Sequence, residues 1–368
     1  MAGPGMRVTA LDVRDLRILE AVAVEPGPGL NVFLGANAAG KTSVLEAIHV
    51  LATGRSFAAT RTGRLVRSGH GPMRIVGRVQ DAQGGAVHRL GVERRASGPA
   101  RMRVDGRPAE RMAELARLLP VVAIHPESHQ LVAGGPGERR SLLDQGLFHV
   151  EPRFHAAWQR YRRALSQRNV LLRCRAREAE LRPWEAELAH SGEQLDSMRR
   201  GYVERLERGI GELAGSLLGD AGGVELSYRR GWNEGESLET ALARLRHRDL
   251  EQRVTGAGPH RADLVFRLAG RDVRQRVSRG QQKLLVYLVR LAQAGQLAAS
   301  GDGSCVLLLD DLPAELDAEH RRRVLTAAAS IGAQSFITAL DRDSLPIPAE
   351  SACSVFHVEQ GTVSEVIH

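Results

Sequence analysis

The sequence contains little lysine, few aromatic residues and few cysteines. Only two of its 51 basic residues, Lys41 and Lys283, are lysines, so arginine supplies almost all of the positive charge. Aromatic residues make up 4% of the chain, which argues against binding single-stranded nucleic acid by stacking bases on aromatic platforms. The three cysteines are isolated and odd in number, which speaks against a disulfide framework and fits a reducing cytoplasm.

Long apolar runs are missing as well. No stretch reaches the roughly 18–20 residues that are needed to span a membrane. The N-terminus also lacks the apolar core of a signal peptide. We therefore expect a cytoplasmic protein without a membrane partner.

What the chain does contain is the composition of a basic globular protein. Its 368 residues, 43% hydrophobic and 26% charged, suffice for a large core and two lobes. A net charge of +8 and a pI of about 10.2 indicate a polyanionic partner. An arginine-biased genome that makes any surface basic is the alternative explanation.

One glycine-bounded loop carries the clearest chemical signal. It reads GANAAGKT and has the spacing GxxxxGK[ST], between an apolar run at 30–34 and a helical pattern at 43–51. Backbone N–H groups of such a loop and the following helix N-terminus cradle β- and γ-phosphates. Lys41 would neutralise phosphate charge and Thr42 would hold Mg²⁺. The predicted ATP-binding residues are Gly35, Ala36, Asn37, Ala38, Ala39, Gly40, Lys41, Thr42 and Ser43.

An acidic pair supplies the second half of this site. The apolar run 306–309 ends in Asp310 and Asp311, the pattern of a buried parallel strand whose carboxyl end faces a ligand. Asp310 is predicted to hold Mg²⁺, whereas Asp311 would polarise the attacking water, with Lys41 as the other catalytic residue. Because an aspartate is shorter than a glutamate, we expect turnover below the ~10 s⁻¹ that is typical of enzymes.

Further candidate contacts are cationic or lie at a helix start. Ser278 opens the stretch SRGQQK ahead of a helical pattern, which can form an anion site or a simple serine cap. Arg17 precedes the phosphate loop and could swing back to the nucleotide, or remain a surface cation. Four arginines suit contacts to a DNA backbone, although a solvated loop is an equal alternative: Arg55, Arg61, Arg64 and Arg67.

Periodicity divides the chain into three parts. Residues 6–34 and 73–107 read as strands, with Asp105-Gly106 as the strongest hairpin signal. Residues 137–217 read as helices, with Pro183 in the first turn of one of them. Strand patterns return at 224–228 and in a hairpin over 264–277. We predict an α/β fold with a nucleotide-binding head at 1–120 and 226–368 and an inserted helical lobe at 121–225.

Together these motifs resemble the RecF family of bacterial recombination mediators, which have ABC-type ATPase heads. The stretch GPHRADL and the double aspartate are specific to this family rather than to ABC heads at large. The matching stretches run along nearly the whole chain, at 15–17, 35–48, 54–57, 134–144, 167–169, 258–264, 278–283 and 307–317. The resemblance implies an ABC-type P-loop ATPase head of mixed β-sheets and helices, with the helical insertion as an arm.

The resemblance also implies how the protein works. Two copies would close on ATP and Mg²⁺, and the second copy would contact the nucleotide in trans through Ser278, Arg279, Gly280, Gln281 and Asp317. DNA, as duplex or as single-strand/duplex junctions, would bind in an ATP-dependent way and stimulate slow hydrolysis. The partners implied are RecR directly and RecO and RecA indirectly, in the repair of single-strand gaps.

Several residues depart from the family pattern. Ala38 stands where glycine is common, which costs little if its φ is negative, and Ile18 stands where asparagine is usual. Ala314 replaces a serine, and Ala339 replaces the switch histidine of many ABC heads, which again favours slow hydrolysis. Gln130 is the candidate for the glutamine that contacts Mg²⁺.

Three other functions remain open at this point. An ABC transporter subunit would need a membrane partner, which the helical insertion and basic pI disfavour. A P-loop kinase would not need the stretch at 278–283. A DNA clamp that does not hydrolyse its nucleotide differs from the RecF-like function only in turnover.

Overall fold

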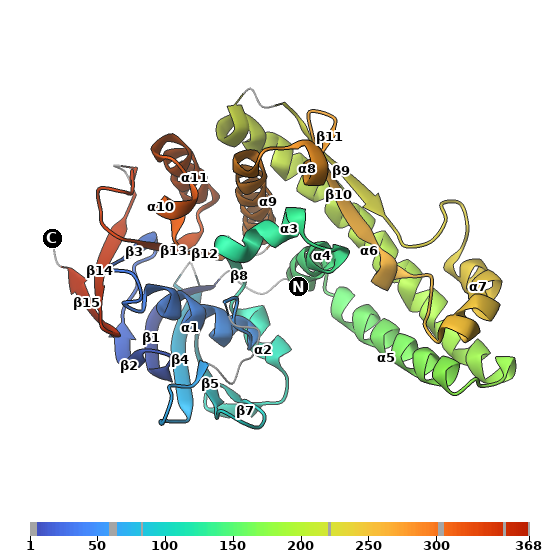
Figure 1. The fold of residues 1–368 in the computed structure, drawn as a ribbon. Coiled ribbons are helices and arrows are strands. Elements are labelled where there is room, and N and C mark those ends of the chain that lie inside the picture. The colour runs from blue at the N-terminus through green and yellow to red at the C-terminus, as the bar shows by residue number, and fades with distance from the viewer. Residues whose placement is uncertain are drawn as a thin grey trace. The chain divides into compact units, whose positions relative to one another are not determined.

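The protein is described by a computed structural model, which covers residues 6–58, 65–81, 84–219, 222–300, 305–348 and 351–366. The chain forms two compact units (Figure 1). The first comprises Met1–Ser128, Gly215–Gly219 and Arg279–His368, and the second comprises His129–Ala214 and Asp220–Ser278. These limits differ from the predicted division at residues 120 and 225.

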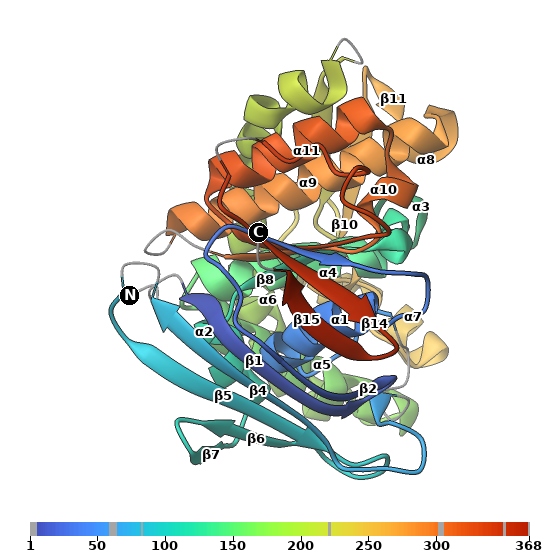
Figure 2. The ribbon, with the colours of Figure 1, turned by 90° about the vertical axis from the view of Figure 1, so that its left-hand side faces the viewer.

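The first unit contains an antiparallel sheet in the strand order β2-β1-β4-β5-β6-β7 (Figure 2). Its strands are β1 (Met6–Leu16), β2 (Leu19–Val24), β4 (Met73–Asp81), β5 (Val87–Arg94), β6 (Arg101–Val104) and β7 (Arg107–Ala109). Asp105 and Gly106 have φ of 51° and 79° between β6 and β7, as the predicted hairpin turn requires. The predicted strands at 73–107 are thereby confirmed.

A second sheet of the first unit has the order β15-β14-β3-β13-β12-β8. It consists of β3 (Leu30–Leu34), β8 (Val121–Ile124), β12 (Val306–Leu309), β13 (Gln334–Ala339), β14 (Cys353–Glu359) and β15 (Thr362–Val366). All neighbours are parallel except β14 and β15. The predicted parallel strand at 306–309 is confirmed. Residues 121–124, predicted to begin the helical lobe, instead pair with β12 in this sheet.

The helices of the first unit include α1, which follows the glycine-bounded loop directly. They are α1 (Lys41–Thr53), α2 (Met112–Leu118), α9 (Arg279–Ser300), α10 (Leu312–Glu315) and α11 (Ala318–Ile331). Gly54 ends α1 as a left-handed C-terminal cap, with φ 68°, and donates its N–H to the carbonyl of Val50. Phe33 stacks on Phe356 at 4.9 Å, which links β3 to β14 in the core.

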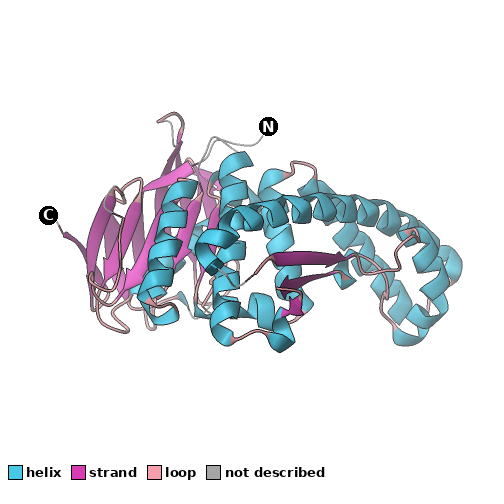
Figure 3. Ribbon diagram, turned by 90° about the horizontal axis from the view of Figure 1, so that it is seen from above, coloured by secondary structure: helices cyan, strands magenta, loops and turns pink. Residues whose placement is uncertain are grey.

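The second unit is mainly helical, whereas most strands belong to the first (Figure 3). Its helices are α3 (Gln130–Ala133), α4 (Pro136–Val150), α5 (Phe154–Arg173), α6 (Glu178–Leu218), α7 (Leu238–Gln252) and α8 (Val273–Arg276). Its small sheet contains β9 (Val224–Arg229), β10 (Asp263–Leu268) and β11 (Arg271–Asp272). No helix in the described part of the chain is long and apolar enough to cross a membrane.

Residues 226–278 belong to this second unit, although the sequence predicted them in the head. The reason is packing, because α7 contacts α5 and β10 contacts α4. The hairpin predicted over 264–277 was wrong in its second half. The Asp272 side chain accepts from the N–H of Arg274 and starts α8 after a strand of only two residues, β11.

Pro183 also lies elsewhere than predicted. Helix α6 begins at Glu178, so Pro183 is inside the helix rather than in its first turn. The helix starts early because the Glu180 carboxylate accepts from the N–H of Arg177, at 2.9 Å. Glu178 and Glu180 both lie in the first turn, where negative charge is favourable.

Two of the stretches that resemble the family, 134–144 and 258–264, pack together in the second unit. The fully buried Arg139 donates to the Asp263 carboxylate at 2.7 Å. Arg199 of α6 bridges the same stretches, because it bonds both the Asp144 carboxylate and the Pro259 carbonyl. We infer that these stretches hold the helical unit together.

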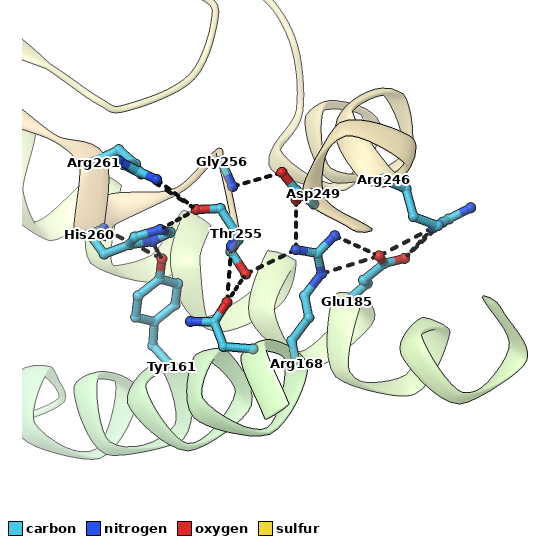
Figure 4. A network of polar contacts seen from close by, with 10 residues as sticks. Tyr161, Arg168, Glu185, Arg246, Asp249, Thr255, Gly256, His260 and Arg261 are labelled. Atoms are coloured by element: carbon cyan, nitrogen blue, oxygen red, sulfur yellow. Dashed lines mark hydrogen bonds and ion pairs between the residues drawn. The ribbon is translucent and has the colours of Figure 1, made fainter. Parts of the chain in front are cut away.

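A second buried network fixes α5 to the segment after α7 (Figure 4). Arg168 is fully buried and donates to Glu185, Asp249 and the Thr255 hydroxyl, at 2.7–3.2 Å. Arg246 adds a second cation on Glu185, at 2.7 Å. Two carboxylates are thus matched by two guanidinium groups, which makes their burial tolerable.

Tyr161 and His260 extend this network. The His260 Nε2 lies 3.0 Å from the carbonyl of Thr255 and must carry the proton, since a carbonyl only accepts. Its Nδ1, 2.6 Å from the Tyr161 hydroxyl, is therefore the acceptor. Removal from water lowers the pKa of His260 to about 4, so the ring is neutral at pH 7.

We expect the second unit to lose stability between pH 6.5 and pH 4. Burial lowers the pKa values of His149 and His260 to about 4, from the ordinary histidine value of 6.5. In this range the unfolded chain binds more protons than the folded one, so acid favours unfolding. Each histidine would contribute a loss of about 2 kcal/mol at pH 5.

Thermal unfolding at pH 7 and pH 5 measures this effect. The control is His260→Gln, whose amide can donate and accept as the neutral ring does but does not titrate. This variant should show a smaller loss between the two pH values than the wild type. Equal losses in both proteins would contradict the assignment.

Candidate nucleotide site

The glycine-bounded loop connects β3 to α1. A Cβ atom on Gly35 would lie 2.2 Å from the carbonyl oxygen of Val358, so β14 leaves room only for glycine there. Gly40 has φ 116°, a conformation that glycine adopts easily, immediately before the first helical residue. These two glycines let the loop turn tightly and present the N-terminus of α1.

Lys41 is folded back over the loop. Its ammonium group donates to the carbonyls of Gly35 at 2.6 Å and Ala36 at 2.8 Å. The side chain is buried, and this burial lowers the pKa of Lys41 against the opposing attraction of Asp311 and Asp310. A desolvated cation within a loop of this shape suits a phosphate group.

Thr42 and Asp310 meet although they are far apart in sequence. The Thr42 hydroxyl lies 2.9 Å and 3.1 Å from the two carboxylate oxygens of Asp310. One residue comes from α1 and the other follows β12. Burial raises the pKa of Asp310, whereas hydrogen bonds from Thr338 and Thr42 oppose the rise. Paired hydroxyl and carboxylate oxygens are hard ligands that fit Mg²⁺.

Thr338 contacts both acids, a role that the sequence patterns did not predict. Its hydroxyl donates to Asp310 at 2.9 Å and accepts from the N–H of Asp311 at 2.7 Å. Thr338 lies near the end of β13, next to β12 in the sheet. A polar residue close to the end of a buried strand was the available signal.

Asp311 adopts a left-handed conformation, with φ 55° and ψ 40°, at the start of α10. Aspartate tolerates this region better than most residues. Its backbone is held by Thr338, and its charge is near enough to Lys41 to favour the ammonium form. The predicted role in polarising water stays a prediction.

The backbone conformation of Ala38 differs from the one under which alanine would be tolerated easily. Its φ is 62°, so the condition under which alanine would cost little is not met. An alanine in this conformation costs roughly 1–2 kcal/mol in steric repulsion. The loop therefore carries strain at the position where related loops often have glycine.

We expect Ala38→Gly to stabilise the protein slightly. The relieved repulsion exceeds the loss from a more flexible unfolded chain, for a net gain of up to about 1 kcal/mol. Urea unfolding measures the change. The control is Ala39→Gly, because Ala39 is not among the residues with positive φ and should lose stability. The assignment fails if both variants are equally destabilised.

Arg17 does not lie free at the surface. Its guanidinium pairs with the buried carboxylate of Glu46 in α1, with Nε 2.6 Å from Oε2 and Nη2 2.8 Å from Oε1. The Ser56 hydroxyl also bonds Glu46. Arg17 itself has φ 51°, so both its backbone and its side chain are constrained. Its predicted contact with ATP stays a prediction.

The residues predicted to act in trans lie at two helix starts, and all of them except Gln281 are exposed. Ser278, Arg279 and Gly280 are exposed at the start of α9, and Gln281 is partly buried. Asp317 caps α11, where its carboxylate accepts from the N–H of His320 at 2.9 Å. Lys283, the other lysine, pairs with Glu315 at 2.8 Å.

The remaining candidates are only partly described. Arg55 is exposed, and Arg67 pairs with Glu20 at 2.8 Å. Arg61 and Arg64 lie outside the described residues. Gln130 belongs to the second unit, where its amide lies 3.0 Å from His129. Its role at Mg²⁺ therefore stays a prediction.

Comparison with known proteins decides the family. The sequence matches the RecF/RecN/SMC N terminal domain over residues 7–364. The DNA replication and repair protein RecF of Thioalkalivibrio sulfidiphilus is 43% identical, over 97% of this chain and 99% of its own. The chain belongs to the RecF family. The RecF of Pseudomonas syringae is 41% identical over 98% of both chains.

Solved structures agree with this family and confirm the predicted ATPase-head fold. The recombination mediator RecF with bound ATP, of the RecFOR pathway, superimposes with a TM-score of 0.86 at 25% identity. That match covers 100% of this chain and 99% of the other. An Smc head of Pyrococcus furiosus shares the fold alone, with a TM-score of 0.60 at 16% identity over 98% and 96% of the chains.

Proposed function

We propose that this RecF-family chain is a cytoplasmic, ATP-dependent DNA-binding protein that serves the repair of single-strand gaps. ATP binding would close two heads on DNA, and slow hydrolysis would release them. The observation that carries the proposal is the meeting of Thr42 and Asp310 beside the Lys41 loop. The solved relative with bound ATP and the full-length match to RecF proteins support it.

Different residues of this chain would bind the phosphates and the Mg²⁺ of the nucleotide. The loop and Lys41 would bind the phosphates, and Thr42 and Asp310 would hold Mg²⁺. A bound Mg²⁺ would neutralise charge on the β- and γ-phosphates. Thr338 keeps Asp310 and Asp311 in place, so that Asp311 can accept a proton from water. An aspartate base and alanine at position 339 favour slow turnover.

A second copy of the chain would complete the site. Ser278, Arg279, Gly280 and Gln281 would contact the ATP of the partner from the start of α9, where backbone N–H groups favour an anion. Asp317 would lie in the loop between the copies. Arg55, Arg61, Arg64 and Arg67 would contact the DNA backbone. RecR would bind directly, with RecO and RecA acting in the same pathway.

Dimerisation and DNA binding with ATP, with ADP and without nucleotide test this function. The wild type should dimerise and bind DNA only with ATP. Ser278→Arg should bind ATP normally but remain monomeric, because the larger cation would occupy the start of α9. Size-exclusion chromatography and a fluorescent ATP analogue separate the two effects.

Two outcomes would count against the proposal. Equal DNA binding with and without ATP would remove the nucleotide switch. A Ser278→Arg protein that still forms dimers would show that the site is not completed in trans. Gly295→Ala is a control on α9, because a Cβ atom there meets nothing within 4 Å, and it should behave as the wild type.

A further inference from the structure

Glu46 is a buried carboxylate that the nucleotide chemistry leaves unused. It lies in α1, four residues after Thr42 and thus on the same face of the helix. Its exposed fraction is 0%, although a charged side chain is almost never fully buried without partners. Its two neighbours, Arg17 and Ser56, come from opposite sides of α1 in the sequence.

Both neighbours bond the same oxygen of Glu46. Oε1 accepts from Nη2 of Arg17 at 2.8 Å and from the hydroxyl of Ser56. The Arg17 Nε lies 2.6 Å from the other oxygen, Oε2. The Glu46 carboxylate therefore contacts the guanidinium group of Arg17 along the edge formed by Nε and Nη2. The side chain of Arg17 keeps 31% of its surface exposed, and its contacts with Glu46 are made by Nε and Nη2.

Ser56 connects Glu46 to the basic segment, residues 54–67, that follows α1. Its hydroxyl accepts from the N–H of Ala58 at 3.0 Å. His49 and Thr53 of α1 fix the neighbouring backbone, because the His49 Nδ1 lies 2.7 Å and the Thr53 hydroxyl 3.3 Å from the carbonyl of Arg55. Residues 54–58 are thus held by three side chains of α1, namely Glu46, His49 and Thr53.

The described part of this segment after residue 64 is tied to Arg17 as well. The N–H of Arg17 donates to the carbonyl of Leu65 at 2.7 Å. The N–H of Arg67 donates to the carbonyl of Asp15 at 2.9 Å. Of the proposed DNA contacts, Arg55 directly precedes Ser56, whose hydroxyl bonds Glu46, and Arg67 donates its N–H to Asp15, two residues before Arg17.

Charge would make this connection sensitive to a bound nucleotide. Burial raises the pKa of Glu46, and the attraction of Arg17 and the bond from Ser56 oppose this rise. Drawing Arg17 toward a phosphate would weaken its hold on Oε1, and Ser56 would have to compensate, because an unpaired buried carboxylate is very unfavourable. A change at the nucleotide would thereby alter the bond that holds residues 56–58.

We propose that Glu46 is a positioning residue that orients Arg17 toward the nucleotide and couples ATP binding to the basic segment through Ser56. This inference rests on the proposed ATP-dependent DNA binding. The route of the coupling runs from Arg17 through Glu46 to Ser56.

The test compares Ser56→Ala, Glu46→Gln and Arg17→Ala with the wild type. For each protein, ATP affinity is measured, together with the factor by which ATP strengthens duplex DNA binding. Such factors are typically about 5–150-fold. Ser56→Ala should keep ATP affinity within about twofold but lose most of this factor, because only the bond to the segment is cut. Ser330→Ala on α11 removes a hydroxyl elsewhere and should change neither quantity.

Glu46→Gln should weaken both ATP affinity and the coupling factor. Because Glu46 acts on ATP through Arg17, the double variant with Arg17→Ala should bind ATP no more weakly than Arg17→Ala alone. A merely structural role would instead lower the melting temperature with additive effects on ATP affinity. Should Glu46→Gln fail to fold, Ser56→Ala still decides the coupling.

Two results would overturn the inference. One is a wild-type coupling factor in Ser56→Ala, and the other is additive loss of ATP affinity in the double variant. A wild type whose DNA binding ignores ATP would instead contradict the proposed function. In that case the ATP-affinity cycle still reports whether Glu46 positions Arg17.

Discussion

Replacing Lys41 with methionine should abolish ATP binding and, with it, ATP-dependent dimerisation and DNA binding. Methionine is an unbranched side chain only one atom shorter than lysine, but it removes the charge. It also removes the bonds at 2.6 Å and 2.8 Å to the carbonyls of Gly35 and Ala36. Because Lys41 as a whole residue is only 9% exposed, the attraction of its ammonium group to phosphate is weakly screened. We expect an affinity loss of at least about 100-fold, or ~3 kcal/mol.

The chain provides its own matched control for this experiment. Lys283 is the second lysine, is 37% exposed in its side chain and pairs with Glu315. Lys283→Met removes the same charge. It should leave the ATP affinity of one head within about twofold of the wild type, because an exposed ion pair contributes little. Isothermal titration with ATP and Mg²⁺ measures both variants. An ATP affinity of Lys41→Met within tenfold of the wild type would refute the phosphate-binding role of Lys41.

Replacing Arg168 with methionine should strongly destabilise the second unit. Arg168 is 0% exposed and is the shared partner of Glu185, Asp249 and Thr255. Its loss leaves two buried carboxylates with fewer positive partners. Burial already raises the pKa of Asp249, against the hydrogen bond and charge of Arg168. Breaking a buried pair in this way costs about 3–5 kcal/mol.

Arg163→Met is the control for this prediction, because Arg163 is exposed on the same helix, α5. The change in methylene content and charge is identical, but the stability should shift by less than about 0.5 kcal/mol. Urea unfolding followed by circular dichroism measures both variants. Similar stabilities for Arg163→Met and Arg168→Met would show that the network in Figure 4 contributes little to folding.

Local patterns predicted the nucleotide loop and the acidic strand well. Residues 35–42 and 306–311 each read correctly from a few adjacent positions, because a tight turn and a buried strand impose their requirements locally. The hairpin at Asp105-Gly106 was also predictable, since its positive φ values select these residue types. The family resemblance added the overall head architecture, which matching solved structures confirmed.

Boundaries and strained positions were predicted less well. Pro183 and residues 273–276 were misplaced because side-chain caps, made by Glu180 and Asp272, decided where the helices begin. The φ of Ala38 depends on how the whole loop closes between β3 and α1. Residues 226–278 joined the second unit because their strands and helices pack on α4 and α5, which no local pattern reveals.

The sequence by itself therefore determined the glycine-bounded loop between β3 and α1, the strand that ends in two aspartates, and the family. Only the tertiary structure decided that Thr338 holds both acids, that Arg17 is bound to Glu46, and that Arg168 lies among two carboxylates. The physical reason is desolvation, because a buried charge must find a partner wherever the folded chain brings one near. Those partners lie between 17 and 81 residues apart, beyond the reach of any local pattern.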